Sequence, residues 1–245
     1  MEEISLKAQE IFKIGSFGVT NSVFSTLVVS LVLISIAVIS YKKIRIIPGT
    51  FQSAIEMGTE WLLDLMESML GSMKKAEQYF SLIATIFVFI MVCNLSGILP
   101  GVGSLVINNG GKEIPLFRSP AADLNFTLAF AVISVIVTNI IGIMAVGVFP
   151  HISKFINFKN PIVFFIGILE FVSELAKIIS LSFRLFGNVF AGEVLLTIIF
   201  FLAPYVVPLP FLFLEVFVGL IQSFVFAMLT LVSISLHTAL HQEEH

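Results

Sequence analysis

Long, continuous runs of apolar residues most limit what this chain can fold into. They cover about residues 19–40, 79–99, 124–148, 161–203 and 209–240. A membrane-spanning helix needs about 20 such residues in a row, whereas a membrane-spanning strand would alternate apolar and polar ones. Only 12% of the 245 residues are charged, about half the share in a soluble domain. The sequence therefore predicts a single membrane domain, an all-α integral membrane protein with about five transmembrane helices.

Basic residues next to the runs set the expected orientation. A Lys-Lys-Ile-Arg run at 42–45 follows the first run, and Lys154 and Lys159 follow the third. Because basic loops stay in the cytoplasm, we expect the N-terminus outside and the C-terminus in the cytoplasm. The Gly-, Asn- and Pro-rich segment 101–123 is then an external loop. Residues 1–20 are acidic and lack the basic start of a cleaved signal peptide.

Residues 51–78 are expected to lie along the cytoplasmic membrane surface, because charges recur too often for a spanning helix. Apolar side chains fall on one helical face, and the other face carries Glu56, Glu60, Asp64 and Glu67. Surface helices that bind lipid usually carry Lys and Arg on the polar face. The acidic face is therefore expected either to meet a protein partner or to face solvent.

The last two apolar segments are longer than one membrane crossing requires. A helix over 161–203 would reach roughly 60 Å, twice the hydrocarbon thickness of about 30 Å. It is either a broken hairpin or one strongly tilted helix. Segment 209–240 is also too long, and Pro204, Pro208 and Pro210 separate the two. A tilted helical pair that wraps a curved surface fits both lengths.

Segment 161–203 also carries charges that hydrocarbon does not tolerate without a function. An uncompensated charge at the bilayer centre costs from about 3 to over 10 kcal/mol. The charged side chains of this segment are Glu170, Glu174, Lys177, Arg184 and Glu193.

Most of these side chains share one helical face. Taking 100° per residue, the polar side chains within about 40° of Arg184 are Glu170, Ser173, Lys177, Ser180 and Asn188. Glu193 points to the opposite side and lies about 13 Å further along the axis, so it does not form a simple pair with Arg184 within the helix. On the last helix, Glu215 and Gln222 share a face, and Ser233 continues that line.

These residue types suit ion transfer. Arg184 stays protonated at physiological pH, so it cannot relay a proton, but it can stabilise a carboxylate and repel other cations. Glu193 and Glu215 can gain and lose protons. Amides and hydroxyls can hold water or orient the carboxylates, and this set consists of Asn188, Gln222 and Ser180. The pattern describes a proton or cation path with a fixed positive charge in it.

Structural roles for the same residues stay open. Glu170 and Lys177 can pair through Glu174 near the cytoplasmic interface, and Arg184 can pair with Glu193 or Glu215 across helices. Gln222 and Asn139 can link helices by hydrogen bonds. Asp123 can be either a helix N-cap or part of the conduit.

The sequence also excludes several kinds of site. A single cysteine, Cys93, excludes an internal disulfide and a cysteine metal cluster. No Gly-rich loop ends in Gly-Lys-Ser/Thr, so no nucleotide site is expected. A net charge of −3 does not favour nucleic-acid binding. His237, His241 and His245 recur every four residues, and a solvated tail is expected there rather than a metal site.

The motif at 179–193, Ile-Ser-Leu-Ser-Phe-Arg-Leu-Phe-Gly-Asn-Val-Phe-Ala-Gly-Glu, resembles subunit a of the rotary F-type ATP synthases, in their bacterial form. Supporting stretches lie at 94–101, 122–128, 221–226 and 243–245. The resemblance covers nearly the whole chain from about residue 45. It implies one long tilted helix, rather than a hairpin, followed by a second long helix, both facing a ring of c subunits.

The resemblance also implies a role for each site residue. Arg184 would meet the c-ring carboxylates and separate two offset half-channels. Glu193 and Glu215 would line the external half-channel, with Asn188 and Gln222 beside them. Residues that would complete the ion path are Glu170 near the cytoplasmic half-channel, Ser180 and Asp123. Glu215 stands where some relatives carry His, so two carboxylates replace a Glu–His pair.

The implied partners are the c ring, the b-subunit peripheral stalk, the rest of the ATP synthase and the lipid bilayer, in a bacterial plasma (inner) membrane. No cofactor is expected, and the chain by itself is not an enzyme. Two other function classes remain open. A stand-alone secondary transporter would use Arg184 to bind an anionic substrate, and a structural subunit would use buried ion pairs and tolerate Arg184→Gln.

Overall fold

The computed structural model describes residues 8–14, 17–99, 105–109, 112–155 and 161–239. Five of its helices are long and apolar enough to cross a membrane. They are α1 (Asn21–Lys42), α3 (Met73–Ser96), α4 (Leu124–Val146), α6 (Pro161–Leu202) and α7 (Pro208–Ala239). The prediction of an all-α integral membrane protein is therefore confirmed.

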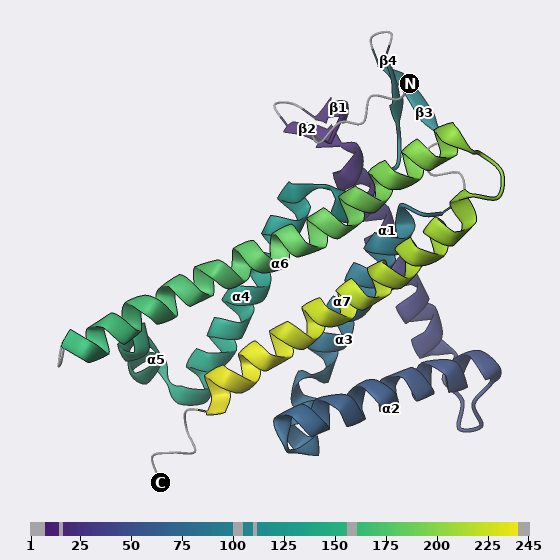
Figure 1. Cartoon of the computed structure of the whole chain (residues 1–245). Helices are drawn as coiled ribbons and strands as arrows, with labels where there is room; N and C mark the ends of the chain where they lie inside the picture. The colour runs from purple at the N-terminus through teal and green to yellow at the C-terminus, as the bar shows by residue number, and fades with distance from the viewer. Residues whose placement is uncertain (1–7, 15–16, 100–104, 110–111, 156–160, 240–245) are drawn as a thin grey trace.

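Helix α6 is one continuous helix of 42 residues, so the broken-hairpin alternative is wrong. Helix α6 ends at Leu202, two residues before Pro204, and α7 begins at Pro208 with Pro210 in its first turn. Figure 1 shows the two helices running side by side in opposite directions, inclined to the steeper α3 and α4 behind them. Both lean on α4, and α7 also packs on α3.

Hydrogen bonds between helices fix how α7 sits on its neighbours. The side-chain amide of Asn94 on α3 donates to the Gly219 carbonyl oxygen at 2.9 Å. The hydroxyls of Ser134 on α4 and Thr230 on α7 lie 2.9 Å apart. Buried polar pairs of this kind link helices in a membrane, where apolar contact alone gives no preferred partner.

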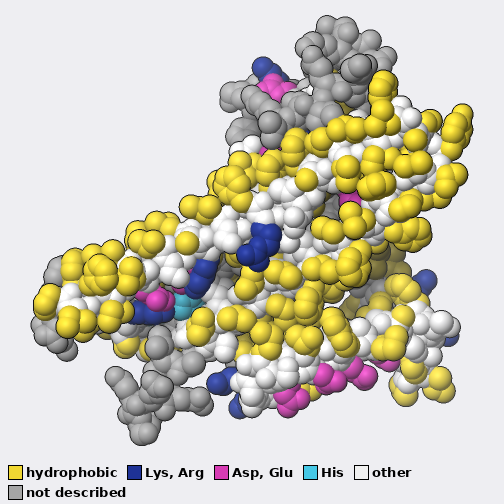
Figure 2. Space-filling model, in the orientation of Figure 1, with side chains coloured by type: hydrophobic (Ala, Val, Ile, Leu, Met, Phe, Trp, Pro, Cys, Tyr) yellow, Lys and Arg dark blue, Asp and Glu magenta, His cyan; other side chains and the backbone are white. Residues whose placement is uncertain are grey.

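Helix α2 (Thr50–Leu70) is shorter than the surface helix predicted over 51–78. Gly71 takes a left-handed conformation (φ 68°), which ends the helix, and α3 starts at Met73. One face of α2 is buried through Leu62 and Met66. The acidic side chains lie exposed along the outer edge of the molecule (Figure 2), and they are Glu56, Glu60, Asp64 and Glu67.

A short helix, α5 (Val148–Phe155), follows α4 and was not predicted. Phe149, Pro150 and His151 were expected to end the third span, but α4 already ends at Val146, with its C-cap at Gly147 (φ 97°). Pro150 lies in the first turn of α5, where a missing backbone N–H costs nothing. The helix packs against α4 and α6.

The sequence analysis also missed two β-hairpins. Strand β1 (Glu10–Ile14) pairs with β2 (Phe17–Thr20), and β3 (Val106–Asn109) pairs with β4 (Lys112–Pro115), both antiparallel. The second hairpin and a 3-10 turn, η1 (Pro120–Ala122), occupy the segment predicted as loop 101–123. Both hairpins lie at the end of the molecule where α6 ends and α7 begins (Figure 1).

Candidate functional site

Arg184 lies near the middle of α6 on an exposed face. Its Nη2 donates to the hydroxyl of Ser180, one turn earlier, at 3.3 Å. Among the residues that the structure describes, no carboxylate forms an ion pair with Arg184. The predicted alternative of a structural pair with Glu193 or Glu215 is therefore absent from the described part of the chain.

Glu193 instead lies beside an arginine that the sequence analysis did not single out. The guanidinium Nη2 of Arg118 lies 3.6 Å from Oε2 of Glu193. The Arg118 side chain is only 8% exposed and that of Glu193 39% exposed. The backbone N–H of Arg118 donates to the Ser25 hydroxyl on α1 at 3.1 Å, which anchors this loop residue beside α6.

Glu215 and Gln222 on α7 face α6 in the same region. The side-chain amide of Asn188 donates to Oε1 of Gln222 at 3.0 Å. A side-chain carbon at Gly192 would lie 2.9 Å from Oε1 of Glu215, so the glycine makes room for the carboxylate. We call Arg118, Asn188, Glu193, Glu215 and Gln222 the Glu193 region.

Three buried polar atoms of the Glu193 region have no hydrogen-bond partner among the described residues. They are Nε of Arg118, Oε2 of Glu215 and Nε2 of Gln222. A buried polar group without a partner costs about 1–3 kcal/mol. Water would satisfy all of these atoms, and a transferred proton would neutralise the Glu215 carboxylate. The region therefore suits ion transfer better than tight packing.

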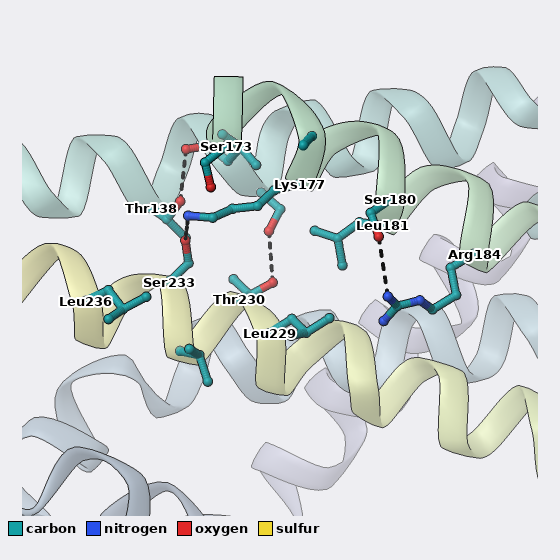
Figure 3. Close-up of a pocket in the computed structure, with 14 residues that line it drawn as sticks. Thr138, Ser173, Lys177, Ser180, Leu181, Arg184, Leu229, Thr230, Ser233 and Leu236 are labelled. Atoms are coloured by element: carbon teal, nitrogen blue, oxygen red, sulfur yellow. Dashed lines mark hydrogen bonds between the residues drawn. The ribbon is translucent and has the colours of Figure 1, made fainter. Parts of the chain in front are cut away.

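On the other side of Arg184, a pocket of about 340 Å³ opens between α4, α6 and α7. Its two cations, Lys177 and Arg184, both come from α6 and lie well apart along it (Figure 3). Its hydroxyl groups belong to Ser134, Thr138, Ser173, Ser180, Thr230 and Ser233. A pocket with this many hydroxyls can hold several water molecules in hydrogen-bonded positions.

Beyond the pocket lies a dense ionic cluster centred on Glu174, whose side chain is 8% exposed. Its Oε1 accepts a 2.6 Å hydrogen bond from the Lys177 ammonium. The same oxygen lies 3.3 Å from Nε2 of His237 on α7. Lys177 also donates to the Ser233 hydroxyl at 3.3 Å, which joins the cluster to the pocket (Figure 3).

Glu170 does not pair with Lys177, as one alternative predicted. Its Oε1 lies 2.5 Å from Nζ of Lys154, on the unpredicted helix α5. Glu170 and Lys177 therefore each pair with another residue, Glu170 with Lys154 and Lys177 with Glu174. The Glu170–Lys154 pair links α5 to the cluster. We call Glu170, Glu174, Lys177 and the residues that contact them, Asn139, His151, Lys154 and His237, the Glu174 region.

His237 is 1% exposed, so the prediction of a solvated tail is wrong for this residue. Helix α7 continues to Ala239 and keeps His237 packed against α4 and α6. Its ring lies 5.5 Å, centre to centre, from the ring of His151 on α5. His241 and His245 lie outside the described residues.

Asp123 is 6% exposed and is the N-cap of α4. Its Oδ1 accepts a hydrogen bond from the Asn125 backbone N–H at 2.9 Å. Its Oδ2 accepts one from the Ser22 hydroxyl at 2.5 Å, which ties α4 to α1. The structure therefore gives Asp123 a capping role.

Comparison with known proteins decides the family. The family model described as "ATP synthase A chain" matches residues 22–235, which include every polar group described above except His237. The chain belongs to this family. It is accordingly a multi-pass bacterial membrane protein, part of an ATP synthase, with the ion-translocating stator role of the membrane sector.

Several curated relatives named ATP synthase subunit a align over most of the chain. The relative from Moorella thermoacetica is 34% identical over 92% of this chain and 94% of its own. The relative from Campylobacter concisus is 33% identical over 91% of each chain. The relative from Geobacter sulfurreducens is 34% identical over 93% of this chain and 91% of its own.

For this member of the ATP synthase A chain family, the structure brings together only part of the predicted site. Asn188 and Gln222 bond to each other, Glu215 faces α6 beside Glu193, and Ser180 bonds to Arg184. Sequence reasoning did not place Arg118, His151, Glu174 or His237 in the site. It expected Asn139 only to link helices by hydrogen bonds, which the 3.4 Å bond from its amide to Glu174 on α6 confirms. Glu174 stood out as a charge in a spanning helix, but nothing in the local sequence showed its partners on α4 and α7.

Proposed function

We propose that this chain carries protons between the two sides of the membrane and the carboxylates of a c ring, with Arg184 as the barrier between two half-channels. The observation that carries the proposal is the exposed guanidinium of Arg184 between two polar regions on one long helix. No described carboxylate neutralises it, so it is available to a carboxylate from another subunit. A carboxylate that reaches Arg184 must lose its proton to pair with it.

The Glu193 region is the external half-channel in this proposal. Glu193 and Glu215 exchange protons there, and Asn188 and Gln222 hold the water or orient the carboxylates. Support comes from the buried, unbonded atoms of Glu215 and Gln222, which call for a mobile hydrogen-bond partner. Asp123 lies at the end of α4 near the same side and would be a further proton-exchanging group.

The pocket beside Arg184 is the cytoplasmic half-channel in this proposal. Ser180 lies at its Arg184 end, and Lys177 lies at its far end. Glu170 would be the acidic group beyond it. A proton released near Arg184 cannot cross the fixed positive charge toward Glu193, so it leaves through the pocket.

The proposed orientation places the N-terminus outside and the C-terminus in the cytoplasm. It follows from the basic residues at 42–45 and on α5, which stay cytoplasmic. The proposed partners are the c ring on the exposed face of α6 and α7 and the b-subunit stalk. The absence of a nucleotide-binding motif fits a subunit that moves ions while ATP chemistry takes place elsewhere in the complex.

The test compares Arg184→Ala with the wild type in membrane vesicles that contain the whole ATP synthase. Arg45→Ala, which removes an exposed arginine between α1 and α2, is the matched control. Acid-driven ATP synthesis and passive proton leak are measured together with the amount of assembled complex. We expect Arg184→Ala to assemble, to lose ATP synthesis and to leak protons, whereas Arg45→Ala behaves as the wild type.

Retained synthesis in Arg184→Ala would overturn the barrier and favour a structural role for the arginine. Ion or solute uptake by the chain alone, without a c ring, would favour a stand-alone transporter. The proposal predicts neither result, because each transported proton must ride on a c-ring carboxylate.

A further inference from the structure

We propose that Glu174, His237 and His151 form a proton-transfer station between the pocket and the cytoplasm. The inference rests on the proposed function, because it extends the pocket side of that ion path. It assigns a proton-carrying role to two histidines and a glutamate for which the path described so far has no use.

The three groups meet although they come from three different helices. Glu174 lies on α6, His237 on α7 and His151 on α5, and the exposed fractions of their residues are 6%, 1% and 4%. Gly142 on α4 makes this meeting possible. A side-chain carbon there would lie 2.9 Å from both Cε1 of His151 and Cβ of His237.

Asn139 on α4 fixes the hydrogen positions in the station. Its amide nitrogen donates to the Val135 carbonyl at 2.8 Å and to Oε2 of Glu174 at 3.4 Å. Its oxygen therefore faces Nε2 of His151, at 3.1 Å. An amide oxygen only accepts, so Nε2 of His151 carries the hydrogen. Nδ1 of His151 is then a lone pair, buried and without a hydrogen-bond partner among the described residues.

His237 provides the link between Glu174 and His151. Its Nε2 lies 3.3 Å from Glu174, and its ring lies against that of His151. Nδ1 of His237 has no hydrogen-bond partner among the described residues either. Two buried imidazoles with unbonded ring nitrogens can pass a proton by small ring movements or through one water molecule.

The station connects to Arg184 through the pocket. Ser233 and His237 lie one turn apart on α7, as Lys177 and Glu174 do on α6. Lys177 contacts both Ser233 and Glu174 and so marks where the pocket ends and the station begins. A proton that leaves the Arg184 end of the pocket meets Glu174 as the first carboxylate on this route.

His151 has the properties of an outlet. It lies on α5, outside the spanning helices, and burial lowers its pKa. His237 and Lys154 lower this pKa further, and Glu174 acts against them. The charged or titratable groups around it are Lys154 from α5, Glu170, Glu174 and Lys177 from α6, and His237 from α7. A histidine with a lowered pKa releases its proton readily near neutral pH.

The charges of the cluster favour a proton over a metal ion. Ligand atoms of Glu170, Glu174 and His237 lie within 4.8 Å of one another, close enough to hold a cation. Both carboxylates, however, already pair with an ammonium group, Lys154 or Lys177. A divalent cation would leave two positive charges without compensation, whereas a single proton adds one charge and then departs.

The transfer makes and breaks only O–H and N–H bonds. A proton from pocket water moves by way of the Glu174 carboxylate to the imidazole of His237, which becomes an imidazolium paired with Glu174. One ring proton of His237 then passes to Nδ1 of His151. His151 releases one proton to cytoplasmic water, so one proton enters and one leaves.

The test uses inverted vesicles that carry the whole ATP synthase, with the cytoplasmic face outward. A potassium diffusion potential drives ATP synthesis, so an added weak base does not collapse the driving force. The variants are His237→Ala, His151→Ala and Glu174→Gln. Glu60→Gln, an exposed glutamate on α2, is the matched control. The amount of assembled complex is measured for each.

We expect His237→Ala and His151→Ala to slow synthesis about a hundredfold, at the low end for loss of a proton-transfer group. Imidazole in the outer medium should restore most of the rate in both, because it replaces the missing ring. Glu174→Gln should be slow and not rescued by imidazole, since the missing group is a carboxylate. Glu60→Gln should match the wild type.

The dependence of the rate on cytoplasmic pH gives a second measurement. In the wild type, acidifying the outer medium should slow synthesis as the histidines stay protonated. This dependence of the synthesis rate on cytoplasmic pH should disappear in His237→Ala and His151→Ala. Unchanged synthesis in the variants, or a loss that imidazole does not restore in either histidine variant, would overturn the station. Such a result would leave the Arg184 barrier untouched, because that barrier is tested by leak through Arg184→Ala.

A different result with Zn²⁺ would also overturn the station. In that result, added Zn²⁺ inhibits the wild type but not His237→Ala, and His237→Ala makes ATP at the wild-type rate. The cluster would then be a cation site rather than a proton path.

Discussion

The Glu174 region and the Glu193 region lie on the same helix, one on each side of Arg184, yet they satisfy their charges differently. Glu174 accepts a 2.6 Å hydrogen bond from Lys177 and lies next to His237 and Asn139. Glu193 lies 3.6 Å from Arg118. Atoms of Glu215 and Gln222 near it have no hydrogen-bond partner among the described residues.

The difference shows two ways to keep polar groups in a membrane helix. A network in which every charge has a counter-charge fixes its members in place and stabilises the helix packing. The Glu174 region also has unbonded atoms among the described residues, but they are ring nitrogens of His151 and His237, whereas its carboxylates are paired. A region whose carboxylate and amide atoms are unbonded gains its stability only when water or ions enter it. We therefore expect substitutions in the Glu174 region to affect stability more than equivalent ones in the Glu193 region.

The largest loss of stability is expected from Glu174→Leu. It leaves Lys177 without its carboxylate in a mostly apolar surrounding, and breaking a buried pair costs about 3–5 kcal/mol. Because the Lys177 side chain is 32% exposed and can turn into the pocket, we expect a loss of about 3 kcal/mol. The loss is measured by the rate at which a maleimide labels Cys93. This single cysteine is buried, so it reacts only when the helices open.

A double variant tests the cause of that loss. Glu174→Leu combined with Lys177→Met removes both charges and leaves two apolar side chains of similar volume. We expect Cys93 in the double variant to be nearly as protected as in the wild type. Equal reactivity of the single and the double variant would mean that packing, not the stranded charge, causes the loss.

The two glycines that make room for polar groups offer a smaller, paired test. At Gly142 an added methyl meets Cβ of His237, which is fixed close to the α7 backbone. At Gly192 it meets the carboxylate end of Glu215, which can rotate away. Overpacking costs about 1–3 kcal/mol where neighbours cannot move. We expect Gly142→Ala to lose about 2 kcal/mol and Gly192→Ala less than half as much.

Cys93 labelling during urea unfolding of the membrane-embedded complex compares the two glycine variants directly. Gly192→Ala should nevertheless slow ATP synthesis, because the added methyl displaces the carboxylate of Glu215, which is proposed to exchange protons. A larger stability loss in Gly192→Ala than in Gly142→Ala would contradict the view that the Glu174 region is the more rigidly packed one.

The sequence predicted the architecture because membrane insertion depends on local hydropathy. Length and apolar content were sufficient for five long helices, and the helical wheel placed Ser180 on the same face as Arg184. Helix ends were harder to predict. Gly71 and Gly147 end their helices by adopting positive φ angles, which a hydropathy pattern does not reveal. The two β-hairpins were not predicted, because strands this short give too little apolar–polar alternation to be recognised in the sequence.

The pairing of the charges was the least predictable part. Glu170 and Lys177 share a helical face, but their partners come from α5 and from within α6. Arg118 comes from a segment read only as a loop, and it reaches Glu193 because Ser25 anchors its backbone. His237 resembled a tail residue, yet α7 extends far enough to bury it. These contacts depend on which helices pack together, which no single helix encodes.

A small stability effect is also expected at Asp123, and two substitutions there separate capping from conduction. Asp123→Ala loses the cap bond to Asn125 and the bond to Ser22, so we expect a loss of about 1 kcal/mol in urea unfolding. Asp123→Asn keeps an oxygen for the cap, and its amide can donate to the Ser22 hydroxyl, so stability should stay unchanged. An asparagine exchanges no proton. If Asp123 belongs to the ion path, Asp123→Asn therefore assembles normally but makes ATP more slowly under acid drive. Full synthesis in this variant would restrict Asp123 to its cap and confine the external path to Glu193 and Glu215.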